Sequence, residues 1–264
     1  MNSSDNSAGT NSNRATFRDC WLLFGNVNDI GWTHAHNAAR KEIHLYLRNK
    51  YRSITMGNGE VDLVVDFESI ATPDTFFMSE EERHKLIVEE YIREKQCDFI
   101  FASSDGILNN RDIEYAKTYP NVSFGRMLVP PQFDNKPPNL VDFWTDWFPS
   151  SFVAGAVAAS LNNAKNRTSC AGFINAFEKA ANAWTHVTGF SMGYQWMNQD
   201  PLSKVHVVTM NSYYQPGAEI VAARQLIEQK GCDVIAKHTD PNVSLLSLFL
   251  DSFSLLITLC NMGV

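Results

Sequence analysis

The chain has 264 residues, which is enough for two compact domains of ordinary size. Hydrophobic residues make up 44% and charged residues 19% of it, which is typical of globular proteins and excludes collagen-like, disordered and membrane-spanning compositions. The 22 basic and 29 acidic residues give a net charge of −7 without a dense run of Lys or Arg, so nucleic acid is not expected as a partner.

The first 14 residues are polar, rich in Ser and Asn, and show no apolar period. This composition predicts a disordered tail, and it lacks the basic and apolar regions of a secretion signal.

The cysteines are scattered along the chain without a CxxC pair. Such spacing favours neither a zinc ribbon nor a disulfide framework, and we expect buried thiols instead. The five positions are Cys20, Cys97, Cys170, Cys232 and Cys260.

Strand, loop and helix patterns alternate through residues 15–128. A continuous apolar run at 20–25 is typical of a buried parallel strand, and residues 33–47 carry apolar side chains at helical spacing. The alternation predicts an α/β lobe in which helices cover both faces of a parallel sheet. Its further elements are expected as strands at 61–67, 98–102 and 122–127 and helices at about 79–95 and 111–119.

A proline-dense stretch separates this lobe from a second region with the same alternation. Residues 129–149 are expected to form an irregular connection and hinge region, and 150–242 a second α/β lobe. The elements expected there are helices at 150–161, 185–197 and 217–229 and strands at 171–176, 204–209 and 233–237.

An internal similarity supports two related lobes. Residues 91–105 (YIREKQCDFIFASSD) match 226–240 (LIEQKGCDVIAKHTD) in a helix end, a Cys-Asp pair, a buried strand and a loop that ends in Asp. Internal similarity at about half the chain length indicates two copies of one αβ unit.

The sequence contains no phosphate-binding glycine loop, nucleophile elbow or zinc-protease motif. His34 and His36 are two residues apart, so a helix directs them to different faces. We therefore predict no cofactor, no metal site and no enzyme activity.

Aromatic and polar residues gather where the predicted strands end, the place where open parallel sheets bind ligands. Flat rings can stack on a planar ligand, while carboxylates and amides bind its polar edges. Alternatively, Asp29 caps the following helix, and Trp32 and Trp184 fill the core. The candidate ligand-binding residues are Asp29, Trp32, Ser103, Ser104, Asp105, Trp184, His186, Asn211, Tyr213, His238 and Asp240.

Four blocks resemble the basic membrane protein family of substrate-binding lipoproteins: DIGWTHAHNAAR at 29–40, AKTYPNVSF at 116–124, NSYYQP at 211–216 and GCDVIAKHTD at 231–240. The resemblance runs from about residue 19 to 240. It implies a type I periplasmic-binding-protein fold that holds a purine or purine nucleoside between two Rossmann-like lobes.

The resemblance also implies roles for single residues. Asp29 and Trp32 look like an acid and a stacking ring, residues 103–105 would border the base, and residues 184–186 and 238–240 would complete the site. The sequence departs from the family in its missing lipoprotein signal and in residues 243–264, an apolar stretch unlike the family. We therefore expect an incomplete second lobe whose apolar tail is exposed or covers a missing part of the sheet.

In function, the resemblance implies a small-molecule binding protein that delivers its ligand to an ABC transporter permease at an extracytoplasmic or cell-surface location. One alternative is the ligand-sensing ectodomain of a signalling receptor that acts on a signalling partner. Another is a nucleoside-processing enzyme such as a nucleoside hydrolase.

Overall fold

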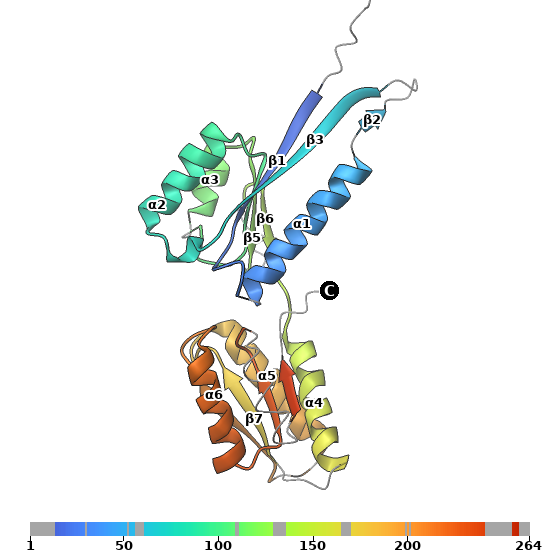
Figure 1. The fold of residues 1–264 in the computed structure, drawn as a ribbon, viewed down its shortest axis with the longest axis vertical. Helices are drawn as coiled ribbons and strands as arrows, with labels where there is room; N and C mark the ends of the chain where they lie inside the picture. Colours follow the sequence, from blue (N-terminus) through green and yellow to red (C-terminus); the bar gives the residue numbers. More distant parts are fainter. Residues whose placement is uncertain are drawn as a thin grey trace, which may run out of the picture. The chain divides into compact units, whose positions relative to one another are not determined.

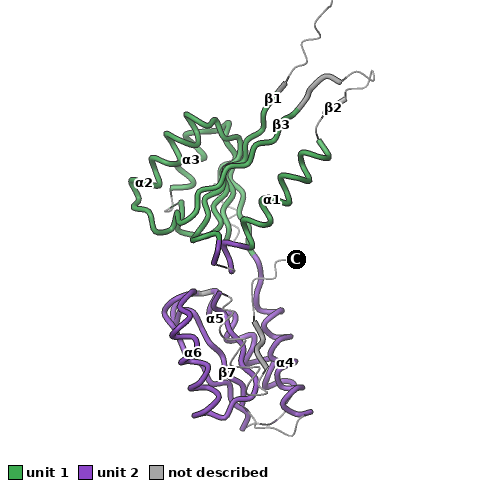
Figure 2. The backbone as a smooth tube through the Cα atoms, in the orientation of Figure 1, with its two compact units in different colours: residues 1–27, 35–144 green, residues 28–34, 145–264 purple. Residues whose placement is uncertain are grey.

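The structure is a computed structural model that describes residues 14–29, 31–51, 53–55, 61–108, 111–128, 136–164, 170–198, 200, 202–240 and 255–258. The chain divides into two compact units (Figure 2). Unit 1 comprises residues 1–27 and 35–144, and unit 2 comprises residues 28–34 and 145–264.

Unit 1 is built on a six-stranded sheet with the order β2-β3-β1-β4-β5-β6. All neighbouring strands are parallel except β2 and β3, which are antiparallel. Figure 1 shows α1 on one face of this sheet and α2 and α3 on the other. The elements are β1 (Arg14–Leu22), α1 (Trp32–Lys50), β2 (Ser53–Thr55), β3 (Val61–Thr72), η1 (Thr75–Phe77), α2 (Glu80–Lys85), η2 (Leu86–Glu94), β4 (Phe99–Ala102), α3 (Asp112–Thr118), β5 (Ser123–Met127) and β6 (Leu140–Phe143).

The continuous apolar run of β1 fills the core on both faces of the sheet, because successive side chains of a strand point to opposite sides. Cys20 and Leu22 belong to the main core cluster beneath η2 and α3. Trp21 and Leu23 pack with Phe101 in a smaller cluster on the other face. The predicted buried parallel strand is therefore present.

Unit 2 is built on a parallel four-stranded sheet with the order β10-β9-β7-β8. Its strand β7 is buried along its whole length. Ala171 and Phe173 point to the α4 and α5 side, and Cys170 and Ile174 to the α6 side. The elements are α4 (Phe148–Ala164), β7 (Cys170–Asn175), α5 (Ala181–Asn198), β8 (Lys204–Thr209), α6 (Pro216–Arg224), η3 (Gln225–Gln229), β9 (Val234–Lys237) and β10 (Leu255–Thr258).

The internal similarity of the sequence has a structural counterpart. The helices before β4 and β9 both end in a π-helical segment, η2 and η3, which is followed by a residue with positive φ: Gln96 at 55° and Gly231 at 69°. The next residue then donates its backbone N–H to the sixth residue before it: Cys97 to Tyr91 O at 2.9 Å, and Cys232 to Leu226 O at 3.0 Å. The two units thus share one helix-to-strand connection.

Two sequence-based expectations differ from the structure, one about residues 140–143 and one about the cysteines. Residues 140–143 lie in the stretch expected to be irregular, yet they form β6, because their backbone completes the ladder beside β5. Part of the apolar tail forms β10, which pairs with β9 and so extends the sheet, in agreement with the second of the two alternatives expected for the tail. Residues 241–254 and 259–264 lie outside the described residues.

The expectation that all cysteines are thiols is wrong for Cys20 and Cys97, which form a disulfide. They are 77 residues apart in sequence, and the pairing of β1 with β4 brings them together, with their Cα atoms 6.0 Å apart. Cys170 and Cys232 are buried, as expected. Within the described residues, no helix is both long enough and apolar enough to cross a membrane.

Candidate ligand-binding site

The loops that leave β7, β8 and β9 meet at one edge of the unit 2 sheet, because parallel strands end on the same side. Hydrogen bonds join these loops: Met210 N donates to Asn175 O at 2.9 Å, and His238 N donates to Ile174 O at 2.9 Å. Asp240 N donates to Tyr213 O at 2.8 Å. The candidate residues that follow these strands are therefore held together by the backbone.

Two buried imidazoles form the centre of this edge. The rings of His186, from α5, and His238, after β9, stack with their centroids 4.2 Å apart and their planes at 28°. The ring of Tyr213 meets His238 edge-on at 5.7 Å. Both histidines are less than 7% exposed, so water contributes little to their environment.

Hydrogen bonding and burial fix the state of the two imidazoles. His186 Nδ1 lies 2.8 Å from Ser151 Oγ. Neither His186 Nε2 nor His238 Nδ1 has a hydrogen-bond partner among the described residues. Burial lowers the pKa of His186 to about 4, and burial with a smaller contribution from His186 lowers the pKa of His238 well below its ordinary value. Both rings are neutral at pH 7 and present unpaired nitrogen atoms.

Asp240 adds a largely buried carboxyl group to the same edge. Its Oδ1 accepts a hydrogen bond from Trp32 N at 3.0 Å. Burial raises the pKa of Asp240 to about 6, and the negative charge of Asp29 adds to the rise. Lys237, itself buried against Glu219 at 3.2 Å, donates to Asp240 O at 2.7 Å and so fixes the backbone there.

Asp29 makes the contacts of a helix cap. Its carboxylate accepts hydrogen bonds from the backbone N–H groups of Gly31, Thr33 and His34 at 2.9 to 3.1 Å, at the start of α1. The alternative prediction of a capping role is thereby confirmed. A Cβ atom at Gly31 would collide with the Asp240 side chain, so only glycine lets the chain pass this closely.

The remaining candidates of unit 2, Trp184 and Asn211, are exposed. Trp184 is 52% exposed, and it lies on a different face of α5 from His186 because the two residues are two positions apart on the helix. Asn211 is exposed and has a positive φ of 55° in the loop after β8.

The three candidates in unit 1 follow the end of β4. Ser103 is fully buried and its Oγ accepts a hydrogen bond from Phe24 N at 2.9 Å, which ties the end of β4 to β1. Ser104 is also buried and donates to Asp105 Oδ1 at 3.2 Å, while Asp105 itself is exposed.

No family model matches the chain. It is 26% identical over 227 residues to a purine-binding protein of Brucella abortus (strain 2308), a match that covers 85% of this chain and 55% of the relative. It is 24% identical over 230 residues to metabotropic glutamate receptor-like protein H of Dictyostelium discoideum, covering 85% of this chain and 26% of that protein. The chain thus spans about half of the first relative and a quarter of the second.

Solved structures agree on the fold. An ABC transporter solute-binding protein from Conexibacter woesei superimposes with a TM-score of 0.60 at 16% identity, covering 91% of this chain and 69% of that one. A transcriptional activator of the comK gene from Bacillus halodurans superimposes with a TM-score of 0.61 at 18% identity. The match covers 91% of this chain and 70% of that one. The fold is that of the type I periplasmic binding proteins. The predicted α/β class with parallel sheets is confirmed.

Some residues beside the histidine pair were not among the candidates predicted from the sequence. They come from helices and loops. Asn182 donates to the Tyr213 hydroxyl at 3.1 Å, and Trp147 packs on His186 at 5.6 Å. The buried Thr239 Oγ1 has no hydrogen-bond partner in the described part of the chain. Thr239 lies between the candidates His238 and Asp240, so its position in the sequence could have indicated it. Nothing in the sequence marks Trp147 or Ser151.

Two other features of the described residues lie away from the strand ends of the unit 2 sheet. A surface hollow of about 420 Å³ in unit 1 is lined by Lys117, Lys136 and Asn139 among others, next to the start of β6 rather than to a strand end. A group that could hold a metal ion, Cys170, His206 and Cys232, involves the start of β7 and the segment before β9. The stacked imidazoles therefore remain the candidate site.

Proposed function

We propose that this chain binds a small planar solute, a purine or purine nucleoside, at the strand-end edge of unit 2. The observation that carries the proposal is the stacked pair of buried neutral imidazoles with their unpaired nitrogens, at the same sheet edge as the largely buried carboxyl group of Asp240. Imidazole nitrogens can donate to or accept from the polar edge of a purine, and a carboxylate accepts from its N–H groups. The similarity to a purine-binding protein supports the same ligand class.

The proposed role is capture of the solute for an ABC-type permease at an extracytoplasmic or cell-surface location. Similarity to an ABC transporter solute-binding protein supports it. The Cys20–Cys97 disulfide supports the location, because disulfides persist mainly outside the reducing cytosol.

A ligand-sensing ectodomain is the second candidate, since a receptor-like protein is among the relatives. The full open reading frame and its neighbouring genes distinguish the sensor from the transport protein. A membrane segment followed by a signalling domain would favour the sensor, and neighbouring permease and ATPase genes would favour transport.

Titration calorimetry with adenosine, guanosine, inosine and the free bases tests the binding proposal. We expect saturable heat with at least one of them, and about tenfold weaker binding for His186→Gln, which removes the ring from the stack. Met192→Gln, at an exposed position of the same helix, should bind like the unchanged chain. Absence of heat with all of these compounds on the folded chain would reject the purine ligand.

We also propose that binding is not followed by turnover. Chromatography of a nucleoside after prolonged incubation with the chain should return the nucleoside intact. Release of the free base would contradict this and favour a nucleoside hydrolase.

A further inference from the structure

Two sulfur atoms meet in the core of unit 2, away from the proposed ligand site. Cys170 Sγ, at the start of β7, lies 2.7 Å from Cys232 Sγ, in the segment before β9. A covalent disulfide would place them about 2.05 Å apart. Cys170 is 7% and Cys232 1% exposed, so packing holds both side chains in place.

The same arrangement carries a disulfide in unit 1. Cys97 and Cys232 occupy equivalent places, each after a π-helical segment and a residue with positive φ, and each two residues before a parallel strand. Cys97 bonds to Cys20 on β1, the strand that pairs with β4.

Strand register places Cys170 on the matching side of unit 2. β1 pairs with β4 through Asp19 opposite Phe99, and β7 pairs with β9 through Ala171 opposite Val234. Cys170 therefore lies two residues before the position equivalent to Cys20. Because side chains of a strand alternate, the two positions face the same side of the sheet, toward the helix that ends before the second cysteine.

The neighbouring His206 makes a metal ion the competing occupant, since its ring nitrogen lies within 4.8 Å of both sulfur atoms. The surroundings favour the disulfide. Partial burial lowers the pKa of His206, and the positive charges of Lys230 and Lys204 lower it further; the same charges oppose a divalent cation. Two sulfurs at 2.7 Å are also much closer than separate ligands on one metal at about 2.3 Å each would lie in a tetrahedral site.

We propose that Cys170 and Cys232 form a second disulfide, which fixes the start of β7 to the segment that enters β9. A small disulfide such as oxidised glutathione is the oxidant. Two protein S–H bonds break and one S–S bond forms, while two electrons and two protons pass to the reagent disulfide, which leaves as two thiols. Since both cysteines are buried in the folded unit, the exchange takes place before η3 packs over β7.

The cross-link has a structural consequence for the other ends of the same strands. β7 ends at Asn175, and β9 leads to His238 and Asp240. Tying the two strands where they begin restricts sliding of β9 along β7, and that register sets where the histidine is held.

Thiol counting on the full chain tests the proposal. Of the five cysteines, only Cys260 should react with a thiol reagent after denaturation without reductant, so we expect one thiol per chain. Non-reducing peptide mapping should recover the 170 and 232 peptides as one cross-linked species. Three thiols per chain in protein matured with oxidised glutathione would overturn the proposal, and so would stoichiometric bound zinc that is lost in His206→Ala.

Variants provide a second measurement. The double change Cys170→Ser and Cys232→Ser should lower the melting temperature of oxidised protein by on the order of 10 °C, whereas Cys260→Ser should not. If the double variant fails to fold, the peptide map of the unchanged chain still decides the question.

Discussion

The stacked imidazoles show how burial changes the charge state of ordinary side chains. A histidine in water titrates near pH 6.5, but His186 and His238 lie where almost no solvent reaches them. Charging either ring would place a cation in the core beside the other ring, so both stay neutral. Burial has the opposite effect on the pKa of Asp240 and raises it, because a carboxyl group becomes charged when it loses a proton, whereas an imidazole becomes charged when it gains one.

These opposite effects predict how stability depends on pH. The pKa of His186 falls from 6.5 to about 4 on folding, so the unfolded chain binds more protons between those values. The free energy of unfolding should therefore fall by about 2 kcal/mol through this residue on acidification from pH about 7.5 to about 5. The pKa of Asp240 rises from 3.8 to about 6, so this residue adds about 1 kcal/mol over the same interval.

Urea unfolding of three proteins at the two pH values checks this prediction. Compared with the unchanged chain, His186→Gln should lose less stability on acidification and Asp240→Asn should lose more. Equal pH dependence in all three proteins would contradict the assignment of these two groups.

Some residue roles could be predicted from sequence and others could not. Asp29 stands directly before an amphipathic helix, so its capping role follows from local sequence alone. The contact between His186 and His238 depends on how α5 lies over the end of β9, and residues 52 positions apart give no sequence signal for it.

At the scale of elements, glycine makes the closest helix contact in unit 2. Gly155 on α4 and Gly193 on α5 let the two backbones approach so far that an added Cβ would overlap backbone atoms of the other helix. We expect Gly193→Ala to force the helices apart and to lower the free energy of unfolding by about 1 to 3 kcal/mol. Gly217→Ala on α6 is the matched control: nothing lies within 4 Å of its added Cβ, so stability should be unchanged or slightly higher.

Denaturant titration of both glycine variants measures the difference. A Gly193→Ala protein as stable as the Gly217→Ala control would show that α4 and α5 can separate at no cost.

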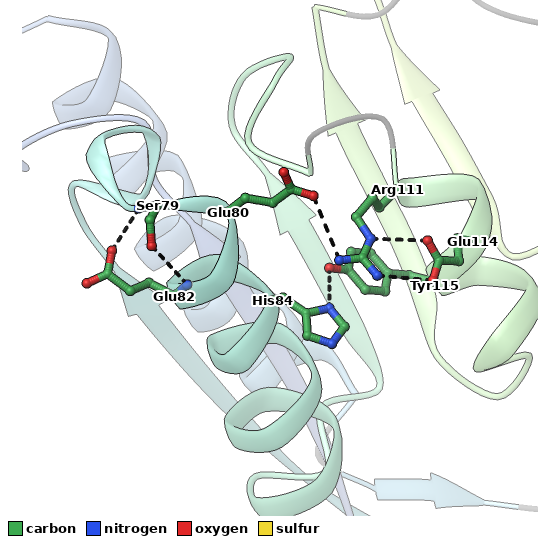
Figure 3. A network of polar contacts seen from close by, with 7 residues as sticks. All are labelled: Ser79, Glu80, Glu82, His84, Arg111, Glu114 and Tyr115. Atoms are coloured by element: carbon green, nitrogen blue, oxygen red, sulfur yellow. Dashed lines mark hydrogen bonds and ion pairs between the residues drawn. The ribbon is translucent and has the colours of Figure 1, made fainter.

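A helix start in unit 1 gives a second prediction at this scale. Ser79 accepts from Glu82 N at 3.2 Å, and Glu82 Oε2 accepts from Ser79 N at 2.7 Å, a complete capping box (Figure 3). Ser79→Ala should lower the free energy of unfolding of unit 1 by about 1 kcal/mol. Ser79→Asp should restore most of the loss, because aspartate also accepts from the backbone at this position. Failure of Ser79→Asp to restore stability would count against capping as the cause.

This capping box could be read from the sequence, since Ser followed three residues later by Glu is its signature. The edge strand β6 and the Cys20–Cys97 bond could not be predicted in this way. Both depend on partners brought together by the sheet, and the prolines around residues 137–138 hide the strand that follows them.

At the scale of the whole molecule, the internal repeat was the most informative sequence feature. It identified two related αβ units, and the parallel β4 and β9 with their shared helix-to-strand connection follow from it. The periodic α/β pattern also predicted most helices and strands, because parallel strands are buried on both faces and stand out as apolar runs. The grouping of residues 28–34 with unit 2 could not be predicted in this way, because in sequence they lie between β1 and most of α1, which belong to unit 1.

Because the chain has two compact units, we predict that a ligand bound to one unit stabilises that unit more than the other. A ligand that binds only the folded state raises the free energy of unfolding by about 2.7 kcal/mol at one hundred times its dissociation constant. Since the proposed contacts with His186, His238 and Asp240 belong to unit 2, the stabilisation should appear in the unfolding of that unit.

Differential scanning calorimetry with the purine that binds in the titration measures the melting temperature of each unit. One variant in each unit shows which transition belongs to it. Ser79→Ala should lower the transition of unit 1, and Gly193→Ala that of unit 2. Saturating purine should then raise the melting temperature of the transition marked by Gly193→Ala. A rise confined to the transition marked by Ser79→Ala would move the ligand to unit 1, where Ser103, Ser104 and Asp105 follow β4, and would reject the histidine pair as the site.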